Sequence, residues 1–249
     1  MAAQFNLTSI QKRYGNKIAL ELEELTLWPG HLYILTGPNG SGKSTLLNIL
    51  ALLTKPEQGE MAFTGERVTW KNRELNLMRK KVTLLHQSPY LFAGTVSANV
   101  AFGLKARGLS GEELQRTVAE SLELVGLKGF EERNVRQLSG GEARRVALAR
   151  AVALKPEMLL LDEPLANMDQ ESAQVVEQLI ASLPDRGTTV VMSTHDPRLN
   201  ERLEGDVIQL MGGRLASENG RYPAYSSGDQ NPGTLKTMLM ADALVMLEG

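Results

Sequence analysis

The stretch Gly37-Pro38-Asn39-Gly40-Ser41-Gly42-Lys43-Ser44-Thr45 decides the fold of this chain. An apolar run at residues 31–36 precedes it and predicts a buried strand, and residues 45–53 follow it with the composition of a helix. Gly37, Gly42, Lys43 and Ser44 fill the pattern G-x-x-x-x-G-K-[ST] in the strand–loop–helix context that this pattern requires.

These residue types suit the binding of a polyphosphate. Glycines let the backbone curl until successive N–H groups face an anion, and the start of the helix adds further donors. Lys43 supplies a cation for the β- and γ-phosphates, and the Ser44 hydroxyl is a suitable Mg²⁺ ligand. The alternative is a chance Gly/Ser-rich loop, but the flanking strand and helix agree with the motif. The sequence therefore predicts binding of a nucleoside triphosphate.

The composition narrows the class of protein. With 249 residues and a hydrophobic fraction of 42%, the chain can form one large domain or two small ones. Its net charge of −2, from 27 basic and 29 acidic residues, gives no bulk basic field for nucleic acid. Cysteine is absent, which excludes disulfides and thiolate metal sites and fits a reducing compartment. Met1 to Phe5 has neither the basic segment nor the apolar core of a signal peptide.

Residues 82–104 carry no Asp, Glu, Lys or Arg and are long enough to cross a bilayer. Polar residues, a proline and two glycines interrupt this stretch. We therefore interpret it as a strand, a loop and a helix, and we expect a protein that is soluble by itself.

The remaining pattern is that of an α/β fold. Predicted strands at residues 5–13, 18–27, 61–63 and 68–70 indicate a small antiparallel layer. Buried strands at residues 82–85, 158–163, 188–193 and 206–210 alternate with helices, which favours a mainly parallel sheet covered by helices on both faces.

Between the strands lies a helix-rich region, residues 94–129, with helices predicted at 96–104 and 110–125. Ser110 followed by Glu113 predicts a capping box at the start of the second helix. Because no nucleotide pattern occurs here, we predict a helical subdomain inserted into the α/β core.

Leu138-Ser139-Gly140-Gly141-Glu142 precedes a helix predicted at residues 143–154. Its two adjacent glycines at a helix start would allow a second close approach of backbone to phosphate. A near-copy at residues 109–113 lacks the second glycine, and we interpret it as a helix cap only.

Two strands end in residues that can do chemistry. Asp162 and Glu163 close one strand, where an aspartate can hold Mg²⁺ and a glutamate can orient or deprotonate an attacking water. His195 follows the next strand. The simpler alternatives are an ordinary acidic pair and a polar residue that closes a strand.

Four separated patterns follow one another along the chain: the phosphate loop, Gln87, residues 138–142, and residues 159–163 with His195. Together they closely resemble the ATP-binding subunit of an ABC (ATP-binding cassette) transporter. The resemblance covers roughly residues 4–217. It implies a P-loop NTPase fold with a RecA-like, mainly parallel sheet, a small antiparallel β layer and an inserted helical subdomain. The core would comprise about residues 1–87 and 150–217, and the helical subdomain about residues 88–149.

The resemblance also implies a role for each matching residue. Gly37 to Thr45 would bind the phosphates of ATP, Tyr14 would stack on adenine, and Ser139, Gly140 and Gly141 would form the signature motif. Ser44, Gln87 and Asp162 would serve Mg²⁺, Glu163 would be the catalytic base, His195 the switch histidine and Asp169 the aspartate of the loop that crosses the dimer. Asn167, Met168 and Glu142 depart from the usual family residues at their positions.

The phosphate loop leaves the outer face of the γ-phosphate open, and Ser139–Gly141 forms a second anion cradle. Two chains arranged head to tail would place each cradle over the other chain's nucleotide, so we expect an ATP-dependent homodimer. The resemblance further implies transmembrane permease subunits docking near residues 88–92, an extracytoplasmic solute-binding protein, and a cytoplasmic location on the inner face of the membrane.

A stand-alone cassette of this length resembles prokaryotic importers of oxyanions such as tungstate, molybdate or phosphate. The alternatives are an exporter subunit and a soluble, non-transport ABC ATPase. A small-molecule phosphotransferase would lack residues 138–142 and His195. Residues 218–249 predict a tail that comprises a loop and a short final helix.

Overall fold

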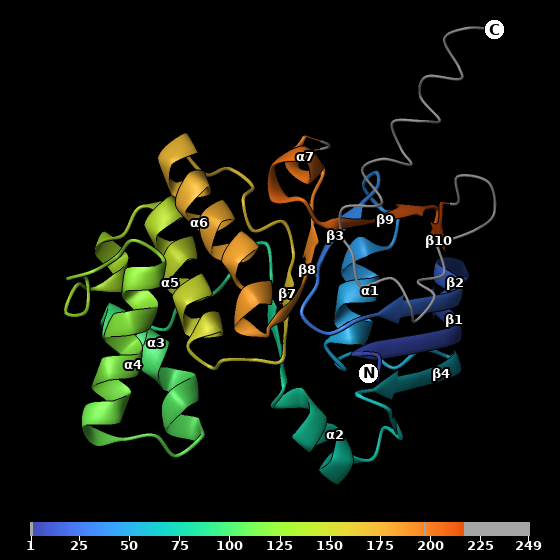
Figure 1. The fold of residues 1–249 in the computed structure, drawn as a ribbon, viewed down its shortest axis with the longest axis horizontal. Helices are drawn as coiled ribbons and strands as arrows, with labels where there is room; N and C mark the ends of the chain where they lie inside the picture. Colours follow the sequence, from blue (N-terminus) through green and yellow to red (C-terminus); the bar gives the residue numbers. More distant parts are fainter. Residues whose placement is uncertain (1, 197, 217–249) are drawn as a thin grey trace, which may run out of the picture. The chain divides into compact units, whose positions relative to one another are not determined.

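Two β-sheets face each other across helix α1 (Lys43–Leu50), as Figure 1 shows. The computed structural model describes residues 2–196 and 198–216. The larger sheet is six-stranded and parallel except for β10, with the order β10-β9-β3-β8-β7-β6. Its strands are β3 (Leu32–Thr36), β6 (Val82–Leu85), β7 (Met158–Leu161), β8 (Thr189–Ser193), β9 (Asp206–Met211) and β10 (Arg214–Leu215).

The smaller sheet is antiparallel and four-stranded, with the order β2-β1-β4-β5. It comprises β1 (Phe5–Tyr14), β2 (Lys17–Leu27), β4 (Gln58–Phe63) and β5 (Glu66–Arg67). Together the two sheets confirm the predicted fold class, including the separate antiparallel layer.

Strand alternation divides the core of the parallel sheet into two apolar clusters. Along β3, Tyr33 and Leu35 pack with α1 and the antiparallel sheet, whereas Leu32 and Ile34 pack with the helices of the opposite face. Successive side chains of a strand point to opposite faces, so a strand covered on both sides is apolar at every position. This is why residues 158–161 are an unbroken apolar run: all of them are buried.

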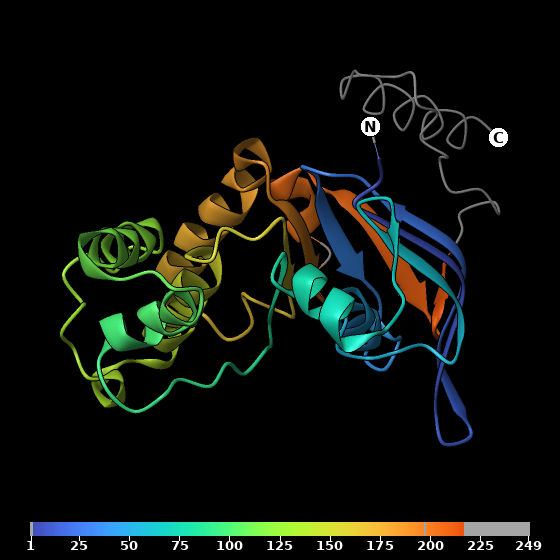
Figure 2. The same ribbon diagram turned by 90° about the horizontal axis from the view of Figure 1, so that it is seen from below.

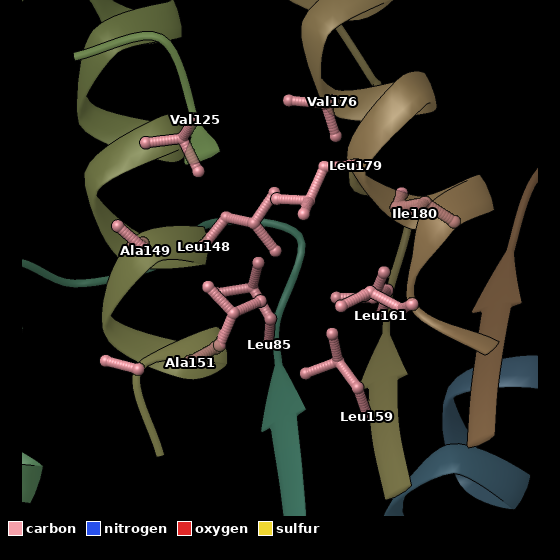
Figure 3. Packing of buried hydrophobic residues seen from close by; sticks show 14 of the residues in the cluster. Leu85, Val125, Leu148, Ala149, Ala151, Leu159, Leu161, Val176, Leu179 and Ile180 are labelled. Carbon is pink, nitrogen blue, oxygen red and sulfur yellow. The ribbon is translucent and has the colours of Figure 1, made fainter. Parts of the chain in front are cut away.

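The helices that contribute buried side chains to the cluster on the second face include α3 (Val96–Ala106), α4 (Gly111–Leu124), α5 (Gly140–Val152) and α6 (Gln170–Ser182). Figures 1 and 2 show α3, α4 and α5 grouped at the end of the molecule away from the antiparallel sheet. Figure 3 shows how α5 and α6 attach to the parallel sheet: Leu148, Leu179 and Ile180 interdigitate with Leu85 and Leu161. The helix that begins at the Ser139 motif is therefore packed directly on β6 and β7, the strands that precede Gln87 and Asp162.

Several local predictions were wrong. Residues 68–70 are not a strand, because the short partner strand β5 lies two residues earlier and Trp70 adopts a positive φ of 57°. Helices α2 (Asn72–Arg79) and α7 (Leu199–Leu203) were not predicted. In α2 only Leu75 and Met78 are buried, which leaves little periodic signal in the sequence.

The predicted capping box was assigned to the wrong helix. Ser110 is the N-cap of α4, but within the described structure its hydroxyl accepts no hydrogen bond from the first turn. A capping box lies instead at the start of α5, where Ser139 Oγ accepts from the Glu142 N–H while Glu142 Oε2 accepts from the Ser139 N–H. For this reason α5 begins at Gly140, three residues earlier than predicted.

Residues 82–104 separate into β6, a loop and the beginning of α3, as predicted. Across residues 2–196 and 198–216, no helix combines the length and apolarity needed to cross a membrane. The predicted tail at residues 218–249 lies outside the described residues.

Candidate functional site

The phosphate loop joins β3 to α1, and its glycines occupy positions that a larger residue could not. A Cβ atom on Gly37, whose φ is 139°, would lie 2.1 Å from the Leu210 carbonyl oxygen. A Cβ atom on Gly42, whose φ is 106°, would lie 2.6 Å from the Ala19 carbonyl oxygen. The loop is thus pressed between β9 and β2, and its glycines are needed both for backbone conformation and for space.

Two polar side chains of the loop, those of Lys43 and Ser41, are buried within it. The Lys43 ammonium donates to the carbonyl oxygens of Gly37 at 2.7 Å and Pro38 at 3.1 Å, so the loop curls around its own cation. Ser41 Oγ is buried and has no hydrogen-bond partner among the described residues. A buried cation and an unsatisfied hydroxyl next to free helix N–H groups fit an anionic ligand such as a triphosphate.

At the carboxyl ends of β6, β7 and β8, three predicted residues meet. The Gln87 amide donates to Glu163 Oε2 at 2.9 Å, and His195 Nδ1 lies 3.4 Å from the same oxygen. The Glu163 side chain is 15% exposed, whereas that of His195 is 66% exposed. The glutamate is therefore a sheltered carboxylate whose neighbours, an amide and an imidazole, lie in the segments that follow two other strands.

Ser193 holds the Asp162 carboxylate and the Glu163 backbone, although the sequence did not single it out. This fully buried residue of β8 donates from Oγ to Asp162 Oδ1 at 2.6 Å and accepts from the Glu163 N–H at 2.9 Å. Glu163 itself adopts a positive φ of 46°, uncommon for a non-glycine residue. A serine two residues before His195 on a predicted strand was the available signal, but which face it occupies depends on strand register.

An open cleft connects these residues with the phosphate loop. Its lining includes Gly37, Pro38 and Asn39 together with Gln87, Glu163 and His195. Thr36, Thr194, Asn200, Val207 and Gln209, none of them predicted as site residues, complete the lining. A phosphate held by the loop would lie in the same cleft as the candidate base.

Neither Tyr14 nor Ser139–Gly141 lines this cleft. Tyr14 is the last residue of β1, and its side chain is 56% exposed. Ser139 and Gly140 are exposed at the start of α5, and nothing among the described residues lies within 4 Å of a Cβ atom placed on Gly140. The second cradle is therefore open on its outer side.

The loop that contains Asp169 lies against that second cradle. Asp169 caps α6 by accepting from the Ser172 N–H at 2.9 Å, and this hydrogen bond holds the pKa of its carboxyl below the ordinary value. A Cβ atom on Gly141 would lie 3.3 Å from Asp169 Oδ2. Arg144, one turn further along α5, donates to the Ala166 carbonyl oxygen of the same loop. The start of α5 and the loop that contains Asp169 thus form one surface.

Oxygen atoms of three predicted residues also fit Mg²⁺ as ligands. Ser44, Gln87 and Asp162 offer hydroxyl, amide and carboxylate oxygens, the hard ligands that this ion prefers. Within the described residues, no three His, Asp or Glu side chains cluster as a metal cage would require. Mg²⁺ is commonly held by one or two protein oxygens together with the phosphates of the substrate.

Comparison with known proteins identifies the class that this fold and site define. Residues 20–166 match the family described as ABC transporter, so the chain belongs to the ABC transporter family as an ATP-binding cassette. One relative aligns with this chain over its own whole length. It is the tungstate uptake system ATP-binding protein TupC of Peptoclostridium acidaminophilum, 34% identical across 88% of this chain and 100% of the relative.

Other relatives serve different systems. The energy-coupling factor transporter ATP-binding protein EcfA of Methanothermobacter thermautotrophicus is 42% identical over 76% of this chain. The Fe(3+) ions import ATP-binding protein FbpC 1 of Haemophilus influenzae is 38% identical over 84% of it. This chain spans 61% and 63% of the length of these two relatives.

Solved structures agree with this assignment. The dimeric structure of MJ0796, a bacterial ABC transporter cassette, is 33% identical with a TM-score of 0.79 over 86% of this chain and 97% of that chain. A second dimeric structure of that cassette is a post-hydrolysis state bound to ADP and Pi, at 32% identity and a TM-score of 0.76, covering 86% of this chain and 97% of that chain. These findings confirm the predicted class, an ATP-binding cassette of the ABC transporter family.

Proposed function

We propose that this chain is the ATP-hydrolysing subunit of an ABC importer for a small anion. The observation that carries the ATPase part is the contact of Glu163 with both Gln87 and His195 in the cleft that begins at the phosphate loop. A sheltered carboxylate beside a phosphate-binding loop, with an amide and an imidazole on the same oxygen, suits attack of water on a γ-phosphate.

In this mechanism the phosphate loop binds the β- and γ-phosphates through its N–H groups and through Lys43, which exchanges its loop carbonyls for phosphate oxygens. Glu163 accepts a proton from the attacking water, and Gln87 and His195 orient that water and the γ-phosphate. Bound Mg²⁺, held by Ser44 and Asp162 with Gln87 nearby, would neutralise charge on the phosphates. Tyr14 would stack on the adenine.

The second cradle supports a dimer in which each ATP lies between two copies of the chain. Ser139–Gly141 does not line the cleft of its own chain and is open on its outer side, so it is free to cover the nucleotide of a partner. The Asp169 loop, which contacts the same helix, would cross this interface. ATP binding then closes the dimer and hydrolysis releases it.

A transport role implies partners outside this chain. We propose transmembrane permease subunits, which place the cassette at the cytoplasmic face of the membrane, and an extracytoplasmic solute-binding protein that delivers the cargo. The tungstate relative, which this chain covers completely, favours tungstate or a similar oxyanion such as molybdate or phosphate over the iron and energy-coupling-factor systems. No nucleic-acid partner is proposed.

The Glu163→Gln variant tests the ATPase assignment. It keeps the size of the side chain and its ability to accept from Gln87, but it removes the proton acceptor, so hydrolysis should fall by about 100-fold or more while ATP binding persists. Turnover by phosphate release and nucleotide affinity by calorimetry measure the two effects. Turnover equal to that of the unmodified protein would reject Glu163 as the base.

The cargo is tested by reconstitution of the full chain with its permease in proteoliposomes. Solute-binding protein loaded with tungstate, molybdate or phosphate should stimulate ATP hydrolysis, and the protein loaded with Fe³⁺ should not. Stimulation by Fe³⁺ alone would contradict the oxyanion assignment. Co-purification with ribosomes or DNA in place of a permease would contradict the transport role.

A further inference from the structure

Lys12, a residue outside the motifs described above, lies against Tyr14 at the end of the β1–β2 hairpin. Its ammonium is 5.3 Å from the centroid of the Tyr14 ring, within the range of a cation–π contact. The Lys12 side chain is only 13% exposed, although lysine is rarely buried without a partner. Figure 2 shows this hairpin extending beyond the rest of the antiparallel sheet, so its tip has few neighbours to hold it.

The partner that holds Lys12 is the loop that follows α1. The Lys12 ammonium donates to Glu57 Oε1 at 2.6 Å and to the Lys55 carbonyl oxygen at 3.2 Å. The second oxygen of the Glu57 carboxylate accepts from the Arg13 N–H at 2.8 Å. One carboxylate thus fixes the lysine side chain and the backbone next to Tyr14.

These contacts occur where the β1–β2 ladder is irregular. The register of the pairing shifts between Lys12 and Arg13, and such a shift leaves backbone groups without their ladder partner. At this point the Arg13 N–H donates its hydrogen bond to the Glu57 carboxylate. Its hydrogen bonds from Lys12 and Arg13 also lower the pKa of the Glu57 carboxyl, so it is charged at neutral pH.

The contact between Lys12 and Glu57 connects the hairpin that contains Tyr14 with the segment that follows the phosphate-loop helix. The loop at Lys55–Glu57 continues from α1, the helix that begins at the phosphate loop, and β2 contacts that loop at Ala19 beside Gly42. We propose that Lys12 is a positioning residue for Tyr14, and that the Lys12–Glu57 pair sets the affinity for the nucleobase separately from the affinity for phosphate. This inference rests on the proposed function, because it requires that Tyr14 contacts the base.

The physical effect is preorganisation. A ring that is 56% exposed would lose conformational freedom when a base stacks on it, and a ring already held from one side loses less. An exposed ion pair alone contributes little to stability or binding. The expected effect therefore depends on the contact of Lys12 with the Tyr14 ring and on the two hydrogen bonds that Glu57 accepts, from Lys12 and from the Arg13 N–H. A measurement that isolates binding of the base is needed to detect it.

The test compares magnesium ADP with magnesium pyrophosphate, which differ by the adenosine and are not hydrolysed, in calorimetry on the full chain. Base stacking on an aromatic side chain is worth roughly 5- to 100-fold in affinity, so Tyr14→Ala should weaken ADP by about tenfold. Lys12→Met should weaken ADP by ~3- to 10-fold and leave pyrophosphate within about twofold. Lys12→Arg, which keeps the cation, should restore ADP affinity to within about twofold.

Lys81→Met is the matched control, because Lys81 also pairs with a glutamate, Glu157 at 3.1 Å, and lies 6.0 Å from an aromatic ring, that of Phe63. It should leave both affinities unchanged. The double variant Lys12→Met/Tyr14→Ala should bind ADP no more weakly than Tyr14→Ala. Should Lys12→Met not fold, Glu57→Gln provides the same comparison.

The inference is overturned if Lys12→Met, or Glu57→Gln in its place, leaves the ratio of ADP to pyrophosphate affinity unchanged. An equal loss for both ligands would overturn it too, because it would indicate a general structural role. Failure of the proposed function looks different: the unmodified protein would then bind neither ligand, or Lys43→Ala would leave pyrophosphate binding unchanged.

Discussion

At the residue scale, the glycines of the phosphate loop differ in what they tolerate. Gly37 combines a φ of 139° with a Cβ position 2.1 Å from the Leu210 carbonyl oxygen, whereas Gly40 has a φ of 77° and open space around it. Both glycines belong to the same sequence motif, but only Gly37 faces the backbone of β9.

We therefore expect Gly37→Ala to lower the free energy of unfolding by more than ~2 kcal/mol, since strain and a backbone clash add. Gly40→Ala should cost about 1 kcal/mol, from the positive φ alone. Urea denaturation measures both. Equal losses for the two variants would show that the close approach to Leu210 does not matter.

Ser193 is a second residue whose importance comes from its contacts. It holds the Asp162 side chain and the Glu163 backbone, so Ser193→Ala should reduce the rate of ATP hydrolysis as well as stability, by ~1–3 kcal/mol for the unpaired N–H. Ser121 is also buried and hydrogen-bonded, to the Thr117 carbonyl oxygen at 2.7 Å, but in α4. Ser121→Ala should reduce stability without changing turnover, and similar turnover in both variants would argue against a positioning role for Ser193.

At the scale of the element, α5 connects several functional loops through its polar face. Its capping box fixes Ser139, Arg144 reaches the Ala166 carbonyl oxygen, and Arg150 donates to the Tyr90 carbonyl oxygen at 2.9 Å. Its apolar face packs on β6 and β7 (Figure 3). A movement of this helix would therefore reach the loop after Gln87 and the Asp169 loop together.

The capping box predicts a pH dependence of stability. The Ser139 N–H donates to Glu142 Oε2 and holds the pKa of the Glu142 carboxyl below its ordinary value of 4.5. The folded state thus favours the charged form, so this contribution is complete above the ordinary pKa and is lost as the pH falls through the lowered one. Glu142→Gln keeps the acceptor but does not titrate.

The unfolding free energy of the unmodified protein should therefore exceed that of Glu142→Gln at about pH 7, and the difference should shrink as the pH approaches about 3. Urea denaturation of both proteins at several pH values provides the measurement. Curves that remain parallel throughout would contradict the role of the Glu142 charge.

At the scale of the whole molecule, the phosphate loop and the Ser139 motif lie apart within one chain, because Ser139–Gly141 does not line the cleft that begins at the phosphate loop. The proposed dimer makes each site from the phosphate loop of one copy and the Ser139–Gly141 cradle of the other. A closed two-fold dimer uses the same surface on both copies, so two differently damaged chains can complement each other.

Lys43→Ala and Gly141→Asp chains should each be inactive, since every site in either homodimer lacks one half. Their mixture should recover part of the ATPase activity, because a mixed dimer contains one intact site. The measurement is phosphate release before and after mixing. A mixture no more active than the separate variants would contradict a site shared between two copies.

Much of this molecule was predictable because its signals are local. The phosphate loop, the apolar run at residues 158–161 and the alternation of strands with helices follow from residue type and spacing, and they were sufficient for the fold class. The candidate residues Gln87, Glu163 and His195 each follow a predicted strand, and parallel strands end at the same edge of a sheet. Their meeting is therefore a consequence of topology.

The sequence by itself determined the class of protein, the phosphate loop and the chemistry available at the ends of the strands. Only the tertiary structure decided that Ser193 holds Asp162 and Glu163, that Leu210 forbids a side chain at Gly37, and that Lys12 and Glu57 anchor Tyr14. The reason is physical: these contacts join residues far apart in the chain, and their existence depends on strand register and on packing between layers. Neither leaves a periodic trace in the sequence.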